Sequence, residues 1–388
     1  MPNEGRLKIG ANYLKIGANY LRIGPATPRS LYLMACDAAG TTHQYLLKLS
    51  GGVWSVVAHG VNLLPLTGGI SGIDFPPVGG FARQLGSSLW ASGGGQGNTA
   101  AWRSDDGGLT WALKVDYLSV TDYPHGVAVA RDFAGNIWQA ERTSDIFRFR
   151  KSTDNGDTWS TITSVSGDAA YHVATHPSNA NIIAFAGLEE DTVNPFTTIW
   201  VTLDGGSNWS AAQPHQSAGP TSDSTALLFT DTGDLLYVTV DSSSPDEILR
   251  VYKASSPYSS FAETDLLTGN VGVDDGPFLA LSPNPQFAGY NWRSGATPHG
   301  RVWRSAGGAW TELAEPFAAG ERLYGLCYHG TTLYAIGLDT GGTNLKVAEA
   351  ANAGSGSPTW TDITAAVNAA AGVTLAVLMA SALFEVAP

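Results

Sequence analysis

An aromatic residue followed by a short β-prone segment recurs about every fifty residues along this 388-residue chain. The aromatic positions are Trp54, Trp111, Trp159, Trp209, Phe261, Trp310 and Trp360, with successive spacings of 57, 48, 50, 52, 49 and 50 residues. Repeats of this length that each hold several short strands are typical of a β-propeller rather than a β-sandwich. The spacing therefore predicts an all-β chain with seven blades.

The segments between these aromatic residues have the pattern of two strands joined by a tight turn. Five of them run over 125–141, 171–187, 226–240, 278–292 and 322–337. Their turns contain Gly, Asn, Asp or Ser, which supply the backbone conformations that tight hairpins need. We predict that these segments are the two inner strands of their blades and that each aromatic residue opens an outermost strand.

The first repeat begins at its second strand, because residues 30–54 align with 332 onward. The C-terminal run 374–387 has no blade of its own and is predicted to supply the missing innermost strand, closing the ring. Residues 363–384 carry no charge and match a membrane span in length. Because they lack basic flanks and lie where a strand is required, we interpret them as a buried strand.

Three repeats contain the pattern Ser/Thr-x-Asp-x-Gly-x-Thr/Asn-Trp, at 104–111, 152–159 and 202–209. Here the chain resembles the Asp-box, or BNR, propellers, which include sialidases, xyloglucan-cleaving glucanases and sortilin-type receptors. The matching residues are Asp106, Gly108, Trp111, Asp154, Gly156, Trp159, Asp204, Gly206 and Trp209. The resemblance implies a propeller fold, with these turns on the face opposite the active site. The residue types also indicate a structural role, since Asp accepts backbone N–H bonds and Gly allows positive φ.

The opposite face is predicted to be acidic and aromatic. The candidate ligand residues, which lie on loops that enter the innermost strands or join the middle strands, are Asp122, Tyr123, His125, Asp168, Tyr171, His172, Asp274, Asp275, Trp292 and Arg293. Paired carboxylates there would suit glycoside hydrolysis. Solvated acids that cap turns are the competing interpretation, because no spacing distinguishes one pair.

The sialidase resemblance implies three arginines around a substrate carboxylate, a Tyr/Glu nucleophile pair and an acid/base Asp. Arg22 lies in Arg-Ile-Gly-Pro, where a glycine interrupts the family's Arg-Ile-Pro, and Arg142, Arg293 and Arg322 fall in predicted loops of the ligand face. No matching Tyr/Glu pair accompanies them. No catalytic residue is therefore assigned, and sialidase- or glucanase-like hydrolysis stays an alternative.

Charge and composition limit the partners and cofactors that we expect. A formal net charge of -13 argues against duplex nucleic acid and anionic membranes. His125, His172, His215, His299 and His329 show no metal-ligand spacing, so we predict neither a metal nor another cofactor. Cys36 and Cys327 lie in apolar runs and are predicted to be buried thiols without chemistry.

Residues 7–24 contain two copies of the seven-residue unit LKIGANY and the first four residues of a third, LRIG. Apolar and polar residues alternate as in a strand, but a seven-residue period would place Leu7 and Leu14 on opposite sides of one straight strand. We therefore predict a turn at each Gly-Ala-Asn and short stacked β-arcs. The apolar residues of this docking segment are Leu7, Ile9, Tyr13, Leu14, Ile16, Tyr20, Leu21 and Ile23. About twenty residues cannot bury a core alone, so the segment requires a partner unless it is an inert leader.

The sequence thus predicts a docking segment over 1–27 and a propeller over 28–388. This layout, without a visible signal peptide, resembles phage tail and virion appendage proteins, and the wording of the repeat loosely resembles trimeric surface adhesins. The leading hypothesis is a non-enzymatic virion or extracellular surface module, anchored through its N-terminus to a homo-oligomer or to virion proteins and binding host glycans. A trimer is the expected stoichiometry. A purely architectural module without a ligand is a further alternative.

Overall fold

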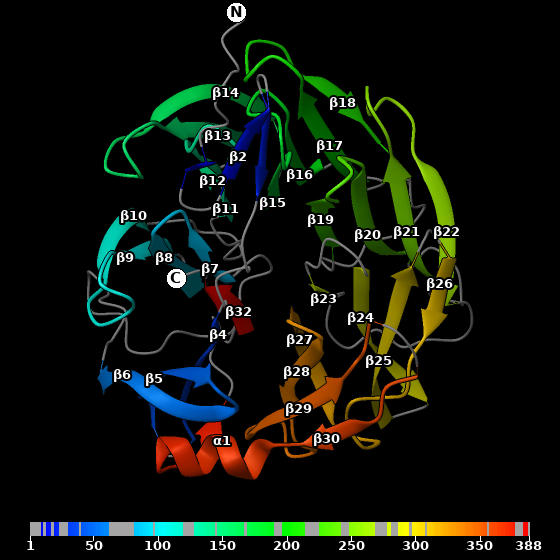
Figure 1. Ribbon diagram of the computed structural model, residues 1–388. Helices are drawn as coiled ribbons and strands as arrows, with labels where there is room; N and C mark the ends of the chain where they lie inside the picture. Colours follow the sequence, from blue (N-terminus) through cyan, green and yellow to red (C-terminus); the bar gives the residue numbers. More distant parts are fainter. Residues whose placement is uncertain are drawn as a thin grey trace, which may run out of the picture.

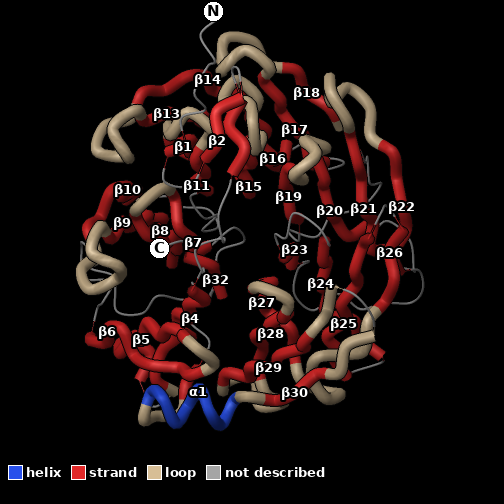
Figure 2. Tube along the Cα trace, in the orientation of Figure 1, coloured by secondary structure: helices blue, strands red, loops and turns tan. Residues whose placement is uncertain are grey.

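The computed structural model shows seven small antiparallel sheets arranged as a ring around a common axis (Figure 1). It describes residues 9–10, 13–16, 19–22 and 30–386, except 39, 62–80, 96–97, 119–127, 144–145, 167–168, 190–195, 214–224, 242–247, 268–277, 281–285, 295–296, 307–308, 355–356 and 377–382. Almost every regular element in the described part is a strand (Figure 2). The predicted seven-bladed propeller is confirmed.

Six blades follow one plan, in which four consecutive strands run antiparallel from the axis outward. Blade 2 contains β7 (Phe81–Leu85), β8 (Ser88–Gly95), β9 (Asn98–Ser104) and β10 (Ala112–Leu118). Blade 3 contains β11 (Ala128–Arg131), β12 (Ile137–Thr143), β13 (Ile146–Ser152) and β14 (Ser160–Ser166). Blade 4 contains β15 (Ala169–Thr175), β16 (Ile183–Glu189), β17 (Phe196–Thr202) and β18 (Ser210–Ala212).

Blades 5 to 7 continue this plan. Blade 5 contains β19 (Thr225–Phe229), β20 (Leu235–Asp241), β21 (Ile248–Ala254) and β22 (Ala262–Leu267). Blade 6 contains β23 (Phe278–Ala280), β24 (Gln286–Ser294), β25 (Thr297–Ala306) and β26 (Ala309–Glu312). Blade 7 contains β27 (Arg322–His329), β28 (Thr332–Leu338), β29 (Leu345–Ala351) and β30 (Trp360–Asp362). In every blade the repeated aromatic residue lies at or within one residue of the outermost strand, as its spacing predicted.

Blade 1 joins the two ends of the propeller. It contains β4 (Ser30–Asp37), β5 (Gly40–Ser50) and β6 (Val53–Val61), and its inner side is completed by β31 (Leu375–Ala376) and β32 (Leu383–Val386). Both C-terminal strands pair antiparallel with β4, through Leu375↔Asp37 and Leu383↔Leu33 among other pairs. The predicted closure of the ring is therefore confirmed.

The first part of the uncharged C-terminal run is helical, which corrects the prediction of a strand throughout. Helix α1 (Thr364–Ala371) has the sequence TAAVNAAA and ends at Gly372, whose φ is 73°. Alanine is the strongest helix former, and a glycine with positive φ is a common helix terminator, so local propensity decided this segment. No described helix has the length and apolarity needed to cross a membrane.

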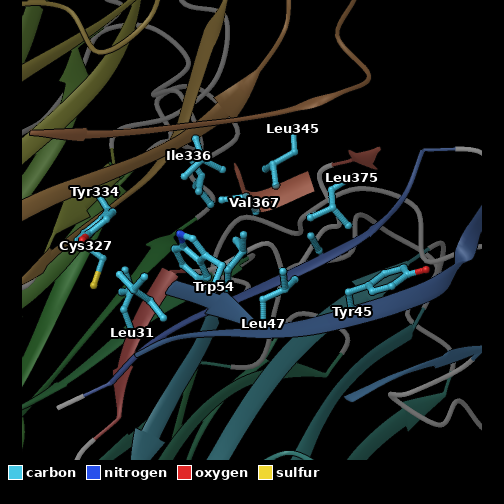
Figure 3. Packing of buried hydrophobic residues seen from close by; sticks show 14 residues of the cluster. Leu31, Tyr45, Leu47, Trp54, Cys327, Tyr334, Ile336, Leu345, Val367 and Leu375 are labelled. Carbon is cyan, nitrogen blue, oxygen red and sulfur yellow. The ribbon is translucent and has the colours of Figure 1, made fainter. Parts of the chain in front are cut away.

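A hydrophobic cluster fills the joint between blades 7 and 1 (Figure 3). Leu47 and Trp54 from blade 1 pack with Ile336 and Leu345 from blade 7, and Val367 of α1 lies between the two sheets. Val367 is fully buried. The helix, which lies at the rim of the ring beside β6 and β29, therefore acts as a wedge in this joint (Figure 1). Cys36 and Cys327 are buried thiols, as predicted, and neither forms a disulfide in the described part of the chain.

The N-terminal repeat forms a separate three-stranded antiparallel sheet of β1 (Ile9–Gly10), β2 (Tyr13–Ile16) and β3 (Asn19–Arg22). The prediction of one turn per repeat is correct, but the stacked β-arcs are wrong. Only two residues separate paired positions such as Gly10↔Tyr13 and Ile16↔Asn19, and two-residue connections containing Gly or Asn favour hairpins. The predicted boundary at residue 27 lies outside the described residues.

Candidate functional site

Six of the ten predicted ligand residues lie outside the described residues: Asp122, Tyr123, His125, Asp168, Asp274 and Asp275. Tyr171 and His172 lie on strand β15, where the pairing with β16 shifts register between Ala170 and His172. The His172 side chain is partly buried, and the structure does not describe that of Tyr171.

Trp292 and Arg293 lie on strand β24, which corrects their prediction as loop residues. The β24–β25 ladder continues through Trp292↔His299 and Arg293↔Pro298 to Ser294↔Thr297, so only residues 295–296 are left to connect the strands. In the described part of the chain, β23 pairs only with 287–289 and β26 only with 303–306. Residues 290–301, which we call the blade 6 hairpin, are the part of the β24–β25 ladder for which β23 and β26 show no pairs in the described structure.

An asparagine fixes the blade 6 hairpin to the innermost strand of blade 7. The Asn291 Nδ2 donates to the carbonyl oxygen of Leu323 at 2.7 Å, and the Leu323 N–H donates to Asn291 Oδ1 at 2.6 Å. Asn291 is fully buried. Its amide thus pairs with the edge of β27 as a further strand would, and satisfies backbone groups that would be costly to leave unpaired there.

Two glycines allow this close approach. A Cβ added at Gly300 would lie 2.9 Å from the Leu323 Cβ, and one at Gly289 would lie 2.7 Å from the Leu323 Cδ2. These contacts are tighter than side chains tolerate, so a larger residue at either position would push the hairpin away from blade 7. No sequence motif marks this contact, because Asn291 and Leu323 are 32 residues apart.

A charged group supports the other side of the hairpin. His299 Nδ1 lies 3.1 Å from Glu315 Oε2, and Arg301 Nη1 lies 3.1 Å from Glu312 Oε1. Arg301 Nε also lies 3.9 Å from Glu315 Oε1. Glu315 belongs to the connection from β26 to β27, so these contacts tie that connection to the hairpin. The register thus places Trp292 and Arg293 on a ribbon that is held from two blades.

The opposite end of the propeller carries the three turns at 104–111, 152–159 and 202–209, which we call the Asp turns. In the first, Asp106 Oδ1 accepts the Thr110 N–H at 2.9 Å and Asp106 Oδ2 accepts the Thr110 hydroxyl at 2.6 Å. The Ser104 hydroxyl donates to Asp106 Oδ1 at 2.8 Å and accepts the Gly108 N–H at 2.8 Å. Equivalent bonds surround Asp154 and Asp204.

These bonds set the ionisation of the three carboxyl groups. Donation from Thr110, first from its side chain and then from its backbone, lowers the pKa of Asp106 to about 2. The side chain and backbone of Asn208 likewise lower the pKa of Asp204 to about 2. The Thr158 side chain is the largest cause of the lowered pKa of Asp154. All three are carboxylates at neutral pH and act as acceptors within the turns, which is unsuitable for a general acid.

The described residues contain no group of three or more His, Cys, Asp or Glu side chains that could hold a metal ion. The register of the hairpin pairs Trp292 with His299 and Arg293 with Pro298.

No protein family and no curated protein matches this chain. Solved structures do. A protein from Lactobacillus plantarum is 12% identical with a TM-score of 0.52, over 92% of this chain and 99% of that one. TolB from Acinetobacter baumannii is 10% identical with a TM-score of 0.45, over 93% and 67%. The arabinofuranosidase Arb93A from Fusarium graminearum is 14% identical with a TM-score of 0.42, over 71% and 95%. At these identities the likeness shows the fold alone, and the chain is similar to enzymes and to other kinds of proteins alike.

Proposed function

We propose that this protein is a non-enzymatic binding module of a virion or surface appendage, which assembles through its N-terminal sheet and presents the propeller to a glycan ligand. The observation that carries this proposal is the division of the chain into a closed ring and a small sheet that pairs only with itself among the described residues. A ring with no free inner edge needs no further strand, so the sheet is not part of its closure.

The N-terminal sheet has the properties of an incomplete unit. Its register aligns Ile9 with Leu14 and Leu14 with Leu21, which forms an aliphatic row across all three strands. Strands β1 and β3 each pair on one side only in the described structure. Three strands of at most four residues bury too little apolar surface to be stable alone, so a partner surface is required. Identical sheets of neighbouring copies would supply one, as in a homo-oligomer.

The blade 6 hairpin supports the ligand-binding part of the proposal. Aromatic rings stack on the apolar faces of sugars, and charged groups bond to their hydroxyls. The bonds from Asn291 to the neighbouring blade fix the backbone of the strand that carries Trp292 and Arg293, so little backbone entropy would be lost on binding.

The assembly part is tested by measuring the solution mass of the full chain and of a variant with Leu14→Asp, which places a charge in the aliphatic row. We expect an oligomer that dissociates to a folded monomer. Lys15→Ser, one position along the same strand, is the matched control and should leave the mass unchanged. A monomeric wild-type chain, or a Leu14→Asp variant that keeps the wild-type mass, would refute self-association through the N-terminal sheet.

The ligand part is tested with a panel of glycans. Trp292→Ala should abolish binding that Ser294→Ala, near the tip of the same hairpin, retains. Equal binding by both variants would place the ligand elsewhere. Release of sugar products from the panel would instead favour a glycoside hydrolase, and loss of that activity on Asp122→Asn or Asp274→Asn would identify its carboxylates.

A further inference from the structure

Two histidines meet on the outer strands of blade 1, remote from both features used above. Strands β5 and β6 pair with Tyr45 opposite His59 and His43 opposite Val61, which makes His43 and His59 diagonal neighbours. His43 Nε2 lies 3.1 Å from His59 Nδ1. The residues are 16 apart in sequence, and the spacing of histidines alone did not reveal the pair.

The geometry of the rings directs the two nitrogens at each other. The ring centroids are 5.4 Å apart and the planes differ by 18°. The centroid separation exceeds the nitrogen separation by about the width of one imidazole ring, so both nitrogens lie close to the line between the centroids. The rings therefore meet edge to edge and share one proton in an N–H···N bond.

The distance between these nitrogens also suits two ligands of a single metal ion. With metal–nitrogen bonds of about 2.0–2.1 Å, two imidazoles on one ion stand roughly 2.9 Å apart at a right angle and roughly 3.4 Å apart at the tetrahedral angle. The observed 3.1 Å lies between these limits. The ion would sit to one side of the nitrogen–nitrogen line, because the midpoint is closer to each nitrogen than a bond allows. Both rings must therefore tilt on binding; His59 is exposed and His43 is partly buried.

Two side chains near the histidine pair, Tyr45 and Asp37, bear on its ability to hold a cation. The buried Tyr45 ring packs against both imidazoles, with centroid separations of 5.1 Å to His43 and 5.6 Å to His59, and limits where they can move. Burial, and then the negative charge of Asp37, raise the pKa of Tyr45. Asp37 is therefore within electrostatic reach of this corner of blade 1.

We propose that His43 and His59 form a two-nitrogen site for a divalent transition metal ion such as Zn²⁺, Ni²⁺ or Cu²⁺, with water in the remaining positions. Imidazole is a preferred ligand of these ions. When both rings are neutral, the donor ring moves its N–H to its other nitrogen and the ion takes the freed lone pair, so no proton is released. A protonated ring must first lose its proton, and binding weakens in acid.

The test is calorimetric titration of the full-length, chelator-treated protein with Zn²⁺ and with Ni²⁺ at neutral pH. We expect one site per chain that His43→Gln and His59→Gln each weaken at least tenfold. The double variant should be no weaker than the singles, because one site is lost in each case. The matched control is His329→Gln, a histidine that contacts Tyr334 on blade 7. Thermal melting without metal confirms that each variant is folded.

Electron paramagnetic resonance of the Cu²⁺ complex adds a readout that does not depend on affinity. Two coupled nitrogens in the wild-type protein and one in either single variant would support the site. Wild-type affinity equal to that of the double variant, or a Cu²⁺ signal unchanged by both substitutions, would overturn it. Neither result bears on the assembly or glycan proposals, which rest on other residues.

Discussion

The Asp turns and the corresponding turn of blade 1 connect the same pair of outer strands but make different contacts. A Cβ at Gly108 would collide with Leu46 of blade 1, and one at Gly156 would collide with Trp90 of blade 2. By contrast, nothing lies within 4 Å of a Cβ at Gly51 or Gly52 in blade 1. An Asp turn is therefore inserted against the preceding blade, whereas the blade 1 turn stands clear of its neighbours.

This difference indicates that neighbouring blades pack against each other in two ways. The joints between blades 1 and 2, 2 and 3, and 3 and 4 are sealed by a turn whose glycine reaches the preceding core. The joint between blades 7 and 1 is sealed by α1, through Val367, and by the paired chain ends. Blade 1 connects the same outer strands without an Asp turn, so the hydrogen bonds to the Asp carboxylate are not needed for the connection itself. They hold the turn in a shape that packs against the preceding blade.

The largest effect is expected for Gly156→Ala. The residue has a φ of 86° and faces Trp90, so a methyl group adds both backbone strain and overpacking, together about 3 kcal/mol of lost stability. Gly51→Ala is the matched control, with a φ of 59° and open space, and should cost about 1 kcal/mol. Urea unfolding measures both. Equal losses would mean that the Asp turn does not seal the joint.

Val367→Ala tests the other way of sealing. Removing two buried methyl groups from the wedge should cost about 2 kcal/mol in the same urea experiment. Ala366→Ser, one position earlier on the exposed side of α1, is the control and should cost less than about 0.5 kcal/mol. If the two substitutions are equivalent, the helix is only a surface element.

The Asp turns should also make the stability of the fold depend on pH in the acidic range. The folded pKa of Asp106 is about 2, below its ordinary value of 3.8, so the folded state binds fewer protons than the unfolded state between these values. The contribution of Asp106 is complete above about pH 4 and declines as the pH falls toward 2. Asp106→Asn should therefore flatten the pH dependence of the urea midpoint in this range. An Asp106→Asn variant whose urea midpoint kept the wild-type pH dependence would contradict this assignment.

The smallest effect is expected at the ion pairs between blades 2 and 3. Asp157 lies 3.1 Å from Arg103 and also pairs with Lys114, but its side chain is 52% exposed. Exposed ion pairs contribute about 1 kcal/mol or less. Asp157→Ser, which introduces the residue found at the same place in the third Asp turn, should cost no more than this, and the loss should shrink in high salt. A larger, salt-independent loss would show that the pair is structurally essential.

The fold was largely predictable because its signals are local or periodic. The spaced aromatic residues located the outermost strands. Because the first repeat lacks an innermost strand, the C-terminal run could be predicted to supply it. The helix at 364–371 was missed because an uncharged alanine-rich run can be helix or buried strand, and the need for a strand dominated the interpretation. Strand pairing in the N-terminal segment depends on the register, and a sequence that repeats itself every seven residues specifies the register only weakly.

The candidate site was less predictable, for a physical reason. Asn291 and Leu323, or His43 and His59, acquire their relation only when strands pair and blades pack, and no motif links them along the chain. The Asp turns are the opposite case, since Asp106 and Thr110 lie within five residues and carry their own pattern.

The split inner strand of blade 1 has a consequence for biosynthesis. Strand β4 is the first propeller strand to be made, but its inner partners β31 and β32 are made after all the other strands that the structure describes. Until those strands are made, the inner edge of β4 is unpaired. It can then pair with other chains before it can pair with β31 and β32. A delay in the synthesis of β31 and β32 should consequently lower the yield of soluble protein more than an equal delay in the synthesis of a middle blade.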